Sequence, residues 1–350
     1  MTENTTITPR SNNCLLGQEK AEEVFLHAYK IGNLHHAWIL SGPQGIGKAT
    51  LAYKIARFLL AADEAHKEQY NSLNVSDKSP IFLQVANGSS PDLMVLERDY
   101  VDADRKKIIS AIKNGEPLDD NELANLKKSA YIRVDDVRKV GEFLAKTSYN
   151  DNWRVVIIDS ADDMNKNAAN ALLKILEEPP ARTLILLISH NAGLLLPTIR
   201  SRCAKLPIFT LSDDTVASLL RRYRSELNEN MIKKLVQMSG GSIGKAILYA
   251  DNDAAKIYDE MCAILCARQN YSLANLLDFS AEMAADENKF AILQELLVKF
   301  IKENMVNAQN PEKLYECWRE TERGFVDCVT VNMDKRLMLV NLFDKICKVL

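Results

Sequence analysis

The chain has 350 residues, of which 47% are hydrophobic and 26% are charged, and its formal net charge is −3 at pH 7. This length accommodates two or three domains with sizeable cores, and the composition is that of an ordinary soluble protein. A net charge so close to zero excludes an overall basic field, so any contact with nucleic acid must come from local patches or from partner proteins.

The sequence predicts a cytoplasmic protein without a membrane segment. No stretch approaches about 18 uninterrupted apolar residues, and residues 1–13 lack the charged-then-apolar order of a signal peptide. The seven cysteines are scattered and odd in number, which argues against a disulfide framework. Cys262 and Cys266 lie four residues apart on a predicted helix, 254–269, and we interpret them as part of its buried face rather than as metal ligands.

Five predicted strands alternate with helices in the first part of the chain. They are the apolar runs at 35–42, 91–98, 153–160, 182–189 and, more weakly, 204–209. This alternation is typical of an α/β domain whose mainly parallel sheet is covered by helices on both faces. We therefore expect a nucleotide-binding-type domain over residues 1–209. The charged, weakly periodic stretch 99–130 is predicted to be an exposed insertion that is partly helical at most.

After residue 209 the strand signals stop, and amphipathic helices follow one another to the C-terminus. The sequence "LSDD" at 211–214 is a helix start, and "MSGGSIGKA" at 238–246 is a break between helices. The last segment, 336–350, has a closing apolar face. The second half of the chain is therefore predicted to be all helical.

The stretch "GPQGIGKAT" at 42–50 has the spacing of a phosphate-binding loop, G-x-x-x-x-G-K-[ST], except at its last position. Lys48 supplies a charge, and the glycines that let backbone N–H groups turn around a phosphate are Gly42, Gly45 and Gly47. Ala49 replaces the hydroxyl that normally holds Mg²⁺, and Thr50 lies about 100° further around the helix. The sequence predicts a phosphate loop that lacks its metal ligand; a glycine turn without a ligand is the alternative.

An ATPase of this type also needs one carboxylate near Mg²⁺ and a second, usually adjacent, to polarise the attacking water. Asp159 ends a predicted strand and suits the first role, but Ser160 occupies the second position. We interpret Asp162 as a cap of the following turn and helix rather than as a displaced general base. Ala49 and Ser160 thus both favour a site that binds without hydrolysing, or that has lost its ligand.

Two further stretches are more specific than the loop alone: "NALLKILEEPP" at 170–180 and "TIRSRC" at 198–203. Together with the loop, they resemble the clamp-loader subunits of bacterial DNA polymerase III, which belong to the AAA+ class, and in particular the delta-prime family. The resemblance covers essentially the whole chain. It implies a RecA-like P-loop domain with a parallel sheet, a small three-helix lid at 210–254 and a C-terminal helical collar, used for oligomerisation, at 255–350.

In that family the Ser-Arg-Cys motif presents an arginine to the ATP of the neighbouring subunit, which implies that Arg202 is an arginine finger. A planar, permanently charged guanidinium suits the charge that develops on the γ-phosphate. From the residues alone, we would favour surface salt bridges for Arg200 and Arg202. The resemblance also implies a γ-phosphate-sensing hydroxyl at Ser189, and it places Gly244 where motor subunits carry a lid arginine. Lys245 is one residue away from that place.

The resemblance implies a non-hydrolysing stator subunit that helps load the sliding clamp onto primed DNA. Its expected partners are the delta and gamma/tau subunits, with the clamp and primed DNA reached through the assembly, and no membrane. ATP or ADP is a possible ligand of the degenerate site, formed by Gly42, Gly45, Gly47, Lys48, Asp159 and Ser189. Many relatives carry a four-cysteine zinc module, but this chain has no cysteine between Cys14 and Cys203, so we expect no zinc.

The isolated chain is not expected to hydrolyse ATP, although the resemblance makes it part of a DNA-directed DNA polymerase, a nucleotidyltransferase holoenzyme. Two alternatives remain open at this point. One is an ATP-hydrolysing motor subunit or another AAA+ ATPase, which Ala49, Ser160 and Gly244 disfavour. The other is a P-loop kinase acting on a small metabolite, in which the long helical second half has no role.

Overall fold

The computed structural model describes residues 8–114, 122, 126, 128–146, 152–306, 308 and 310–350. The chain divides into two compact units. The first consists of Met1–Thr215 with Gly241–Gly244, and the second of Val216–Gly240 with Lys245–Leu350. The finer division into a lid at 210–254 and a collar at 255–350 remains a prediction.

The first unit is built on a parallel sheet of five strands in the order β2-β3-β4-β1-β5. Each strand falls within one of the five predicted runs: β1 (Ala37–Ser41), β2 (Leu93–Leu96), β3 (Arg154–Ile158), β4 (Thr183–Ser189) and β5 (Ala204–Pro207). β3 and β4 are buried along their whole length. This burial explains why the sequence shows continuous apolar runs there rather than alternation.

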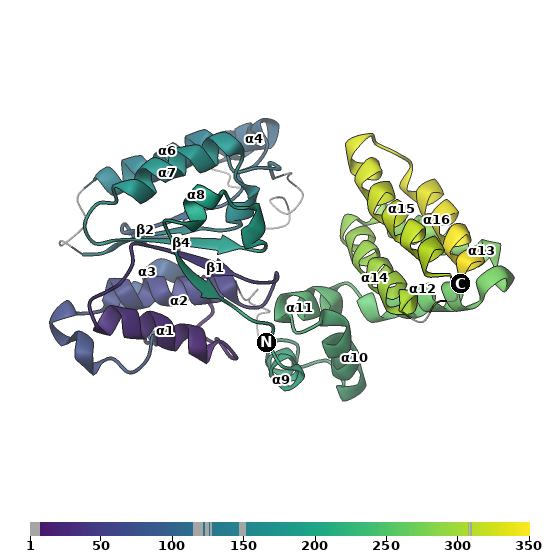
Figure 1. The fold of residues 1–350 in the computed structure, drawn as a ribbon, viewed down its shortest axis with the longest axis horizontal. Coiled ribbons are helices and arrows are strands. Elements are labelled where there is room, and N and C mark those ends of the chain that lie inside the picture. Colours follow the sequence, from purple (N-terminus) through teal and green to yellow (C-terminus); the bar gives the residue numbers. More distant parts are fainter. Residues whose placement is uncertain are drawn as a thin grey trace. The chain divides into compact units, whose positions relative to one another are not determined.

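Helices cover both faces of this sheet (Figure 1). One face packs on α1 (Glu19–Lys30), α2 (Lys48–Ala61) and α3 (Pro80–Ala86), and the other on α6 (Val134–Ala145) and α7 (Lys166–Glu177). Because side chains alternate along a strand, β1 contributes to both cores: Trp38 and Leu40 to the first, Ala37 and Ile39 to the second. The predicted α/β architecture is confirmed.

The predicted insertion at 99–130 is described only in part. Its first half forms α4 (Asp102–Lys113), which leaves Ile109 and Ile112 exposed to solvent. Residues 115–121, 123–125 and 127 lie outside the described residues. The insertion as a whole therefore stays a prediction.

β5 is an edge strand of the sheet, because among the described residues it pairs with β1 alone. Ile208 donates its backbone N–H to the carbonyl oxygen of Ser41, toward β1. Since backbone groups alternate in direction along a strand, Lys205 and Pro207 face the open edge. Proline has no N–H, so the outer edge of β5 lacks a donor at Pro207.

The second unit is all helical, as predicted. Its helices, the first and third of which begin in residues of the first unit, are α9 (Asp213–Tyr223), α10 (Glu229–Ser239), α11 (Ile243–Asp251), α12 (Ala254–Cys266), α13 (Leu273–Ala285), α14 (Glu287–Met305), α15 (Pro311–Thr330) and α16 (Lys335–Val349). Aromatic pairs join these helices: Phe279 of α13 packs on Phe343 of α16, and Phe290 of α14 packs on Phe325 of α15. Among the described residues, no helix is both long and apolar enough to span a membrane.

The prediction that Cys262 and Cys266 lie on the buried face of α12 is wrong. Cys262 is half-buried and Cys266 is exposed. The buried residues of this helix include Ile257, Met261 and Leu265, whose spacing of four makes a stripe beside the two cysteines. The pattern of the large apolar residues, rather than that of the thiols, therefore marks the core face.

Candidate functional site

The loop between β1 and α2 has a backbone that requires glycine. A Cβ atom on Gly42 would lie 2.2 Å from the carbonyl oxygen of Ile208, so no larger residue fits there. Gly47, which immediately precedes α2, has a φ of 100°, a conformation that side chains of L-residues rarely adopt. The predicted strand, loop and helix of a phosphate-binding motif are thus present in the expected order.

Lys48 opens α2 and is buried, with 3% of its surface exposed. Its ammonium group donates hydrogen bonds to the carbonyl oxygens of Gly42, at 2.6 Å, and of Pro43. Burial lowers the pKa of Lys48 from 10.5 to about 8, partly opposed by the nearby carboxylates of Asp159 and Asp162. A phosphate in the loop would have to compete with these carbonyls for the Lys48 ammonium.

A second segment of the first unit, Gly241–Gly244, lies directly against the loop. The Ser242 hydroxyl donates to the carbonyl oxygen of Gln44 at 2.9 Å. The backbone N–H of Gly244 donates to the carbonyl oxygen of Gly45 at 2.8 Å. A Cβ atom on Gly244 would lie 2.8 Å from the Gly45 Cα, so the two backbones touch without room for a side chain. The chain's own groups thus bind carbonyls all along the loop.

Asp162 connects the ends of β3 and β4. Its carboxylate accepts hydrogen bonds from the Ser189 hydroxyl at 2.6 Å, from the backbone N–H of His190, and from that of Asn191 at 3.1 Å. The prediction that Asp162 caps the following helix is wrong, because Asn165 caps α7 by accepting from the Ala168 N–H. Backbone N–H groups just beyond a strand end need partners, and Asp162 supplies one from the short 3-10 helix, Ala161–Asp163, that follows the neighbouring strand β3.

The hydroxyl of Ser189 is therefore already bound. Ser189 is fully buried, and its hydroxyl donates a hydrogen bond to the carboxylate of Asp162. Ser160, at the position expected for the carboxylate that acts as general base, has a left-handed backbone with φ 57° and ψ 56°. Its hydroxyl lies 3.3 Å from Nε2 of His190. Backbone strain of this kind is often found near functional sites, but here the side chain is a hydroxyl and not a carboxylate.

Three titratable groups influence one another at this end of the sheet. Burial raises the pKa of Asp159, with the Lys48 and His190 charges acting in the opposite direction. Burial lowers the pKa of His190, and the Lys48 charge lowers it further. The structure thus brings Lys48 and Asp159 together with His190, a residue that the motif analysis missed because its role depends on contacts across strands.

The geometry supports contact with a phosphate through the loop and Lys48, but Ala49 stands at the position of the metal-binding hydroxyl, and the hydroxyl of Thr50 lies one residue further around α2. Among the described residues, no group of three or more His, Cys, Asp or Glu side chains could hold a metal ion. The expected absence of zinc remains a prediction. ATP, if bound, would be held by the backbone N–H groups of the loop and by Lys48.

Arg202 follows the short helix α8 (Pro197–Arg200) and makes its contacts away from the loop. Its Nη2 lies 2.8 Å from Oε1 of Glu177, and its Nη1 donates to the carbonyl oxygen of Thr198 at 3.1 Å. The Arg202 side chain is 37% exposed. Its neighbour Cys203 is buried, which raises the pKa of that thiol to about 12. A buried residue therefore anchors the segment beside a partly exposed arginine.

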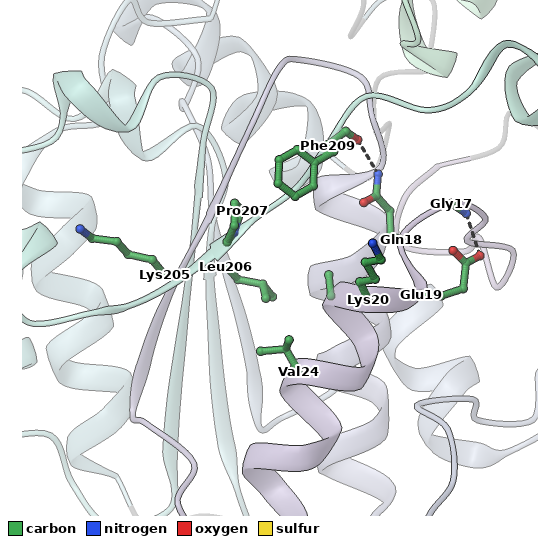
Figure 2. Close-up of a pocket in the computed structure, with 10 residues that line it drawn as sticks. Gly17, Gln18, Glu19, Lys20, Val24, Lys205, Leu206, Pro207 and Phe209 are labelled. Carbon is green, nitrogen blue, oxygen red and sulfur yellow. Dashed lines mark hydrogen bonds between the residues drawn. The ribbon is translucent and has the colours of Figure 1, made fainter.

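A pocket of about 530 Å³ lies between the start of α1 and β5 (Figure 2). It is lined by Gly17, Gln18, Glu19, Lys20, Ala21, Val24, Lys205, Leu206, Pro207 and Phe209. The buried Gln18 joins this pocket to the phosphate loop, because its Nε2 donates to the carbonyl oxygens of both Ile46 and Phe209. Sequence reasoning missed Gln18, since it reads as an ordinary residue before a helix.

Comparison with known proteins gives the family. The profile of the family described as "DNA polymerase III, delta subunit" matches residues 17–212, more than half of the chain. The chain belongs to this family. The predicted resemblance to delta-prime clamp-loader subunits is confirmed.

Individual relatives agree with this assignment. The DNA polymerase III subunit delta' of Pseudomonas aeruginosa is 35% identical over 211 residues, which are 59% of this chain and 53% of that protein. The subunit delta' of Bacillus subtilis is 24% identical over 67% of this chain and 60% of its own length. The match to the Pseudomonas relative thus spans about half of that protein.

Clamp-loader subunits of another type are also similar. The DNA polymerase III subunit gamma of Buchnera aphidicola from Schizaphis graminum is 25% identical over 84% of this chain and 68% of that protein. Among solved structures, a gamma-subunit-related protein of Thermotoga maritima is 17% identical, with a TM-score of 0.47, and covers 93% of this chain and 99% of that one. The fold class is the AAA+ type of P-loop domain that the sequence predicts.

Proposed function

We propose that this chain is a non-hydrolysing stator subunit of a bacterial clamp loader, which donates Arg202 to the ATP site of a neighbouring motor subunit. Its partners would be the delta and gamma/tau subunits, and it would act on the sliding clamp and primed DNA through that assembly. Membership of the DNA polymerase III family supports a role in replication. The residues around the loop and around Arg202 support a chain that does not hydrolyse ATP itself but assists hydrolysis on its neighbour.

The loop of this chain lacks the groups that hydrolysis requires. Ala49 provides no metal-binding hydroxyl, and Ser160 provides no general base. A lid arginine at position 244 is replaced by a glycine whose backbone touches Gly45. Lys245 does not substitute for it, since its ammonium group lies 2.7 Å from Glu295. Each of these differences removes positioning or charge stabilisation from the same reaction.

The observation that carries the proposal is the setting of Arg202. The guanidinium is partly exposed and is held by Glu177 and Thr198 rather than by residues of its own phosphate loop. Ile199 and Cys203, on either side of it, are buried in the core beneath. A rigid base with a reachable guanidinium is what delivery to a phosphate on another subunit requires.

The second unit offers a surface for the assembly. Large apolar side chains on and after α15 remain exposed, namely Tyr315, Val326, Val329, Val331 and Met333. Exposed apolar side chains gathered on one helix are typical of interfaces between proteins. We propose that this face packs against the corresponding domains of the partner subunits.

The test is ATP hydrolysis by the reconstituted loader, stimulated by clamp and primed DNA. Arg202→Ala should leave assembly intact, as judged by gel filtration, and should lower the hydrolysis rate by about 10³ or more, the range of other arginine fingers. A surface arginine without such a role would change stability by less than about 0.5 kcal/mol and leave the rate unchanged. Full activity in an intact Arg202→Ala complex would remove the proposal.

A further inference from the structure

Glu177 and Arg202 form a contact between two elements of the first unit. Glu177 is the last residue of α7, and Arg202 lies just beyond α8. The distance from Oε1 of Glu177 to Nη2 of Arg202 is 2.8 Å. The other terminal nitrogen, Nη1, is bound by the carbonyl oxygen of Thr198. Each terminal nitrogen of the guanidinium is therefore held by a different atom of this chain.

A contribution to folding stability does not by itself explain the contact between Glu177 and Arg202. The C-terminal end of a helix carries a partial negative charge, so a carboxylate at the last position of α7 is unfavourable for that helix. The side chains of Arg202 and Glu177 are 37% and 49% exposed, and ion pairs at such positions contribute little to folding. The main effect of the contact is thus on the direction in which the guanidinium points.

The two elements that carry the pair are fixed by a shared core. Leu172 and Leu176 of α7 pack in the same buried cluster as Ile199 and Cys203. The backbones of Glu177 and Arg202 are therefore fixed by neighbours one to five residues away. The freedom that remains belongs to the arginine side chain, which has many rotamers and is partly in solvent.

We propose that Glu177 is a positioning residue for Arg202, which orients the guanidinium before it reaches the γ-phosphate on the neighbouring subunit. This inference rests on the proposed function. A guanidinium has five N–H donors, so the contacts to Glu177 and Thr198 leave donors for a phosphate. An arginine that is already oriented loses less side-chain entropy when it engages the transition state.

Removing this orientation should affect turnover more than ATP affinity. Fixing one free, rotamer-rich side chain costs an amount that corresponds to a rate loss of about 3- to 10-fold. Glu177 touches Arg202 and not the ATP of the neighbour, so the apparent KM for ATP should stay the same while kcat falls. The loss should be much smaller than that caused by Arg202→Ala.

The experiment measures kcat and KM for ATP in the reconstituted loader, with clamp and primed DNA, for Glu177→Ala, Arg202→Ala and the double variant. Glu177→Gln keeps an oxygen that can accept from Nη2, and should recover most of the lost kcat. The matched control is Glu178→Ala, which removes the next carboxylate along the chain. Gel filtration confirms that every variant is assembled.

The expected result is a loss of kcat in Glu177→Ala that is absent when Arg202 is already alanine, because the two residues act as one unit. A strong effect of Arg202→Ala together with an unchanged kcat in Glu177→Ala would overturn the inference and leave the proposed function standing. An equal loss in Glu178→Ala, or an additive loss in the double variant, would also overturn it. No effect of Arg202→Ala would remove the proposed function, and the inference with it.

Discussion

Gly244 donates its backbone N–H to the carbonyl oxygen of Gly45 at 2.8 Å, so a glycine of the segment Gly241–Gly244 lies directly on a glycine of the phosphate loop. This contact joins two positions that a motif search would treat separately. At residue 244 any side chain would meet backbone atoms of the loop. The close packing of the loop therefore excludes a side chain at the position where the resemblance to motor subunits implies an arginine.

Gly244→Ala should destabilise the first unit. The new Cβ would lie 2.8 Å from the Gly45 Cα, and backbone atoms cannot give way as the end of a flexible side chain can. We expect a loss of about 1–3 kcal/mol, as for other overpacked sites, seen as a lower thermal midpoint. Gly141→Ala, inside α6, is the control, because its Cβ would meet only Ile175 at an ordinary 3.8 Å. Equal midpoints for the two variants would show that the loop contact yields easily.

The pKa of Lys48 predicts a pH dependence of stability. Burial lowers it from 10.5 to about 8, so between these pH values the unfolded chain binds more protons than the folded one. The contribution of Lys48 to the free energy of unfolding therefore rises with pH across that window, by about 1–3 kcal/mol in total. Thermal unfolding should be measured at pH 7.5 and at pH 9.5. From the lower to the higher pH, the midpoint of the wild-type chain should rise relative to that of Lys48→Met. A constant difference between the two proteins would contradict the prediction.

The isolated chain should not hydrolyse ATP, because the metal-binding hydroxyl, the general base and the lid arginine are all missing. Ala49→Thr should not restore turnover, since Ser160 and Gly244 remain. Any binding of ATP should depend little on Mg²⁺, as calorimetry with and without a chelator would show. Turnover that Lys48→Ala abolishes would place the chain among the motor subunits instead.

Charges introduced on the exposed face of α15 should weaken assembly without unfolding the chain. Val326 and Val329 are 54% and 77% exposed, so Val326→Asp and Val329→Asp cost little in the free protein. In a packed interface the same carboxylates would be buried without partners. Leu83→Asp, at the similarly exposed Leu83 on α3, is the control. Gel filtration with the partner subunits should show reduced complex only for the two valine variants.

The sequence was sufficient for the centre of the sheet because β3 and β4 are buried on both faces. β4 is buried from Thr183 to Ser189, and such a strand appears as an unbroken apolar run that needs no knowledge of its neighbours. The phosphate loop could be predicted for a similar reason, since the local backbone conformation itself requires glycine at these positions. Both features depend on residues that lie close together in the sequence.

The contacts between distant segments could not be predicted in this way. Asp162 was expected to cap the helix after it, yet its partners are Ser189 and two N–H groups at the end of the adjacent strand. A carboxylate after a strand looks the same in the sequence whether its donors are three or nearly thirty residues away. The pairing of Glu177 with Arg202 is likewise invisible until α7 and α8 are placed side by side.

Pro207 affects how the outer edge of β5 can pair with strands of other molecules. An open sheet edge with free donors can recruit a strand from another molecule, which is a common start of aggregation. β5 is only four residues long, exposes a lysine and presents Pro207 where a second donor would be needed. The outer edge of β5 is therefore a poor template for a strand from another copy of the chain. Contacts on this flank are then left to side chains, which can be specific for one neighbour.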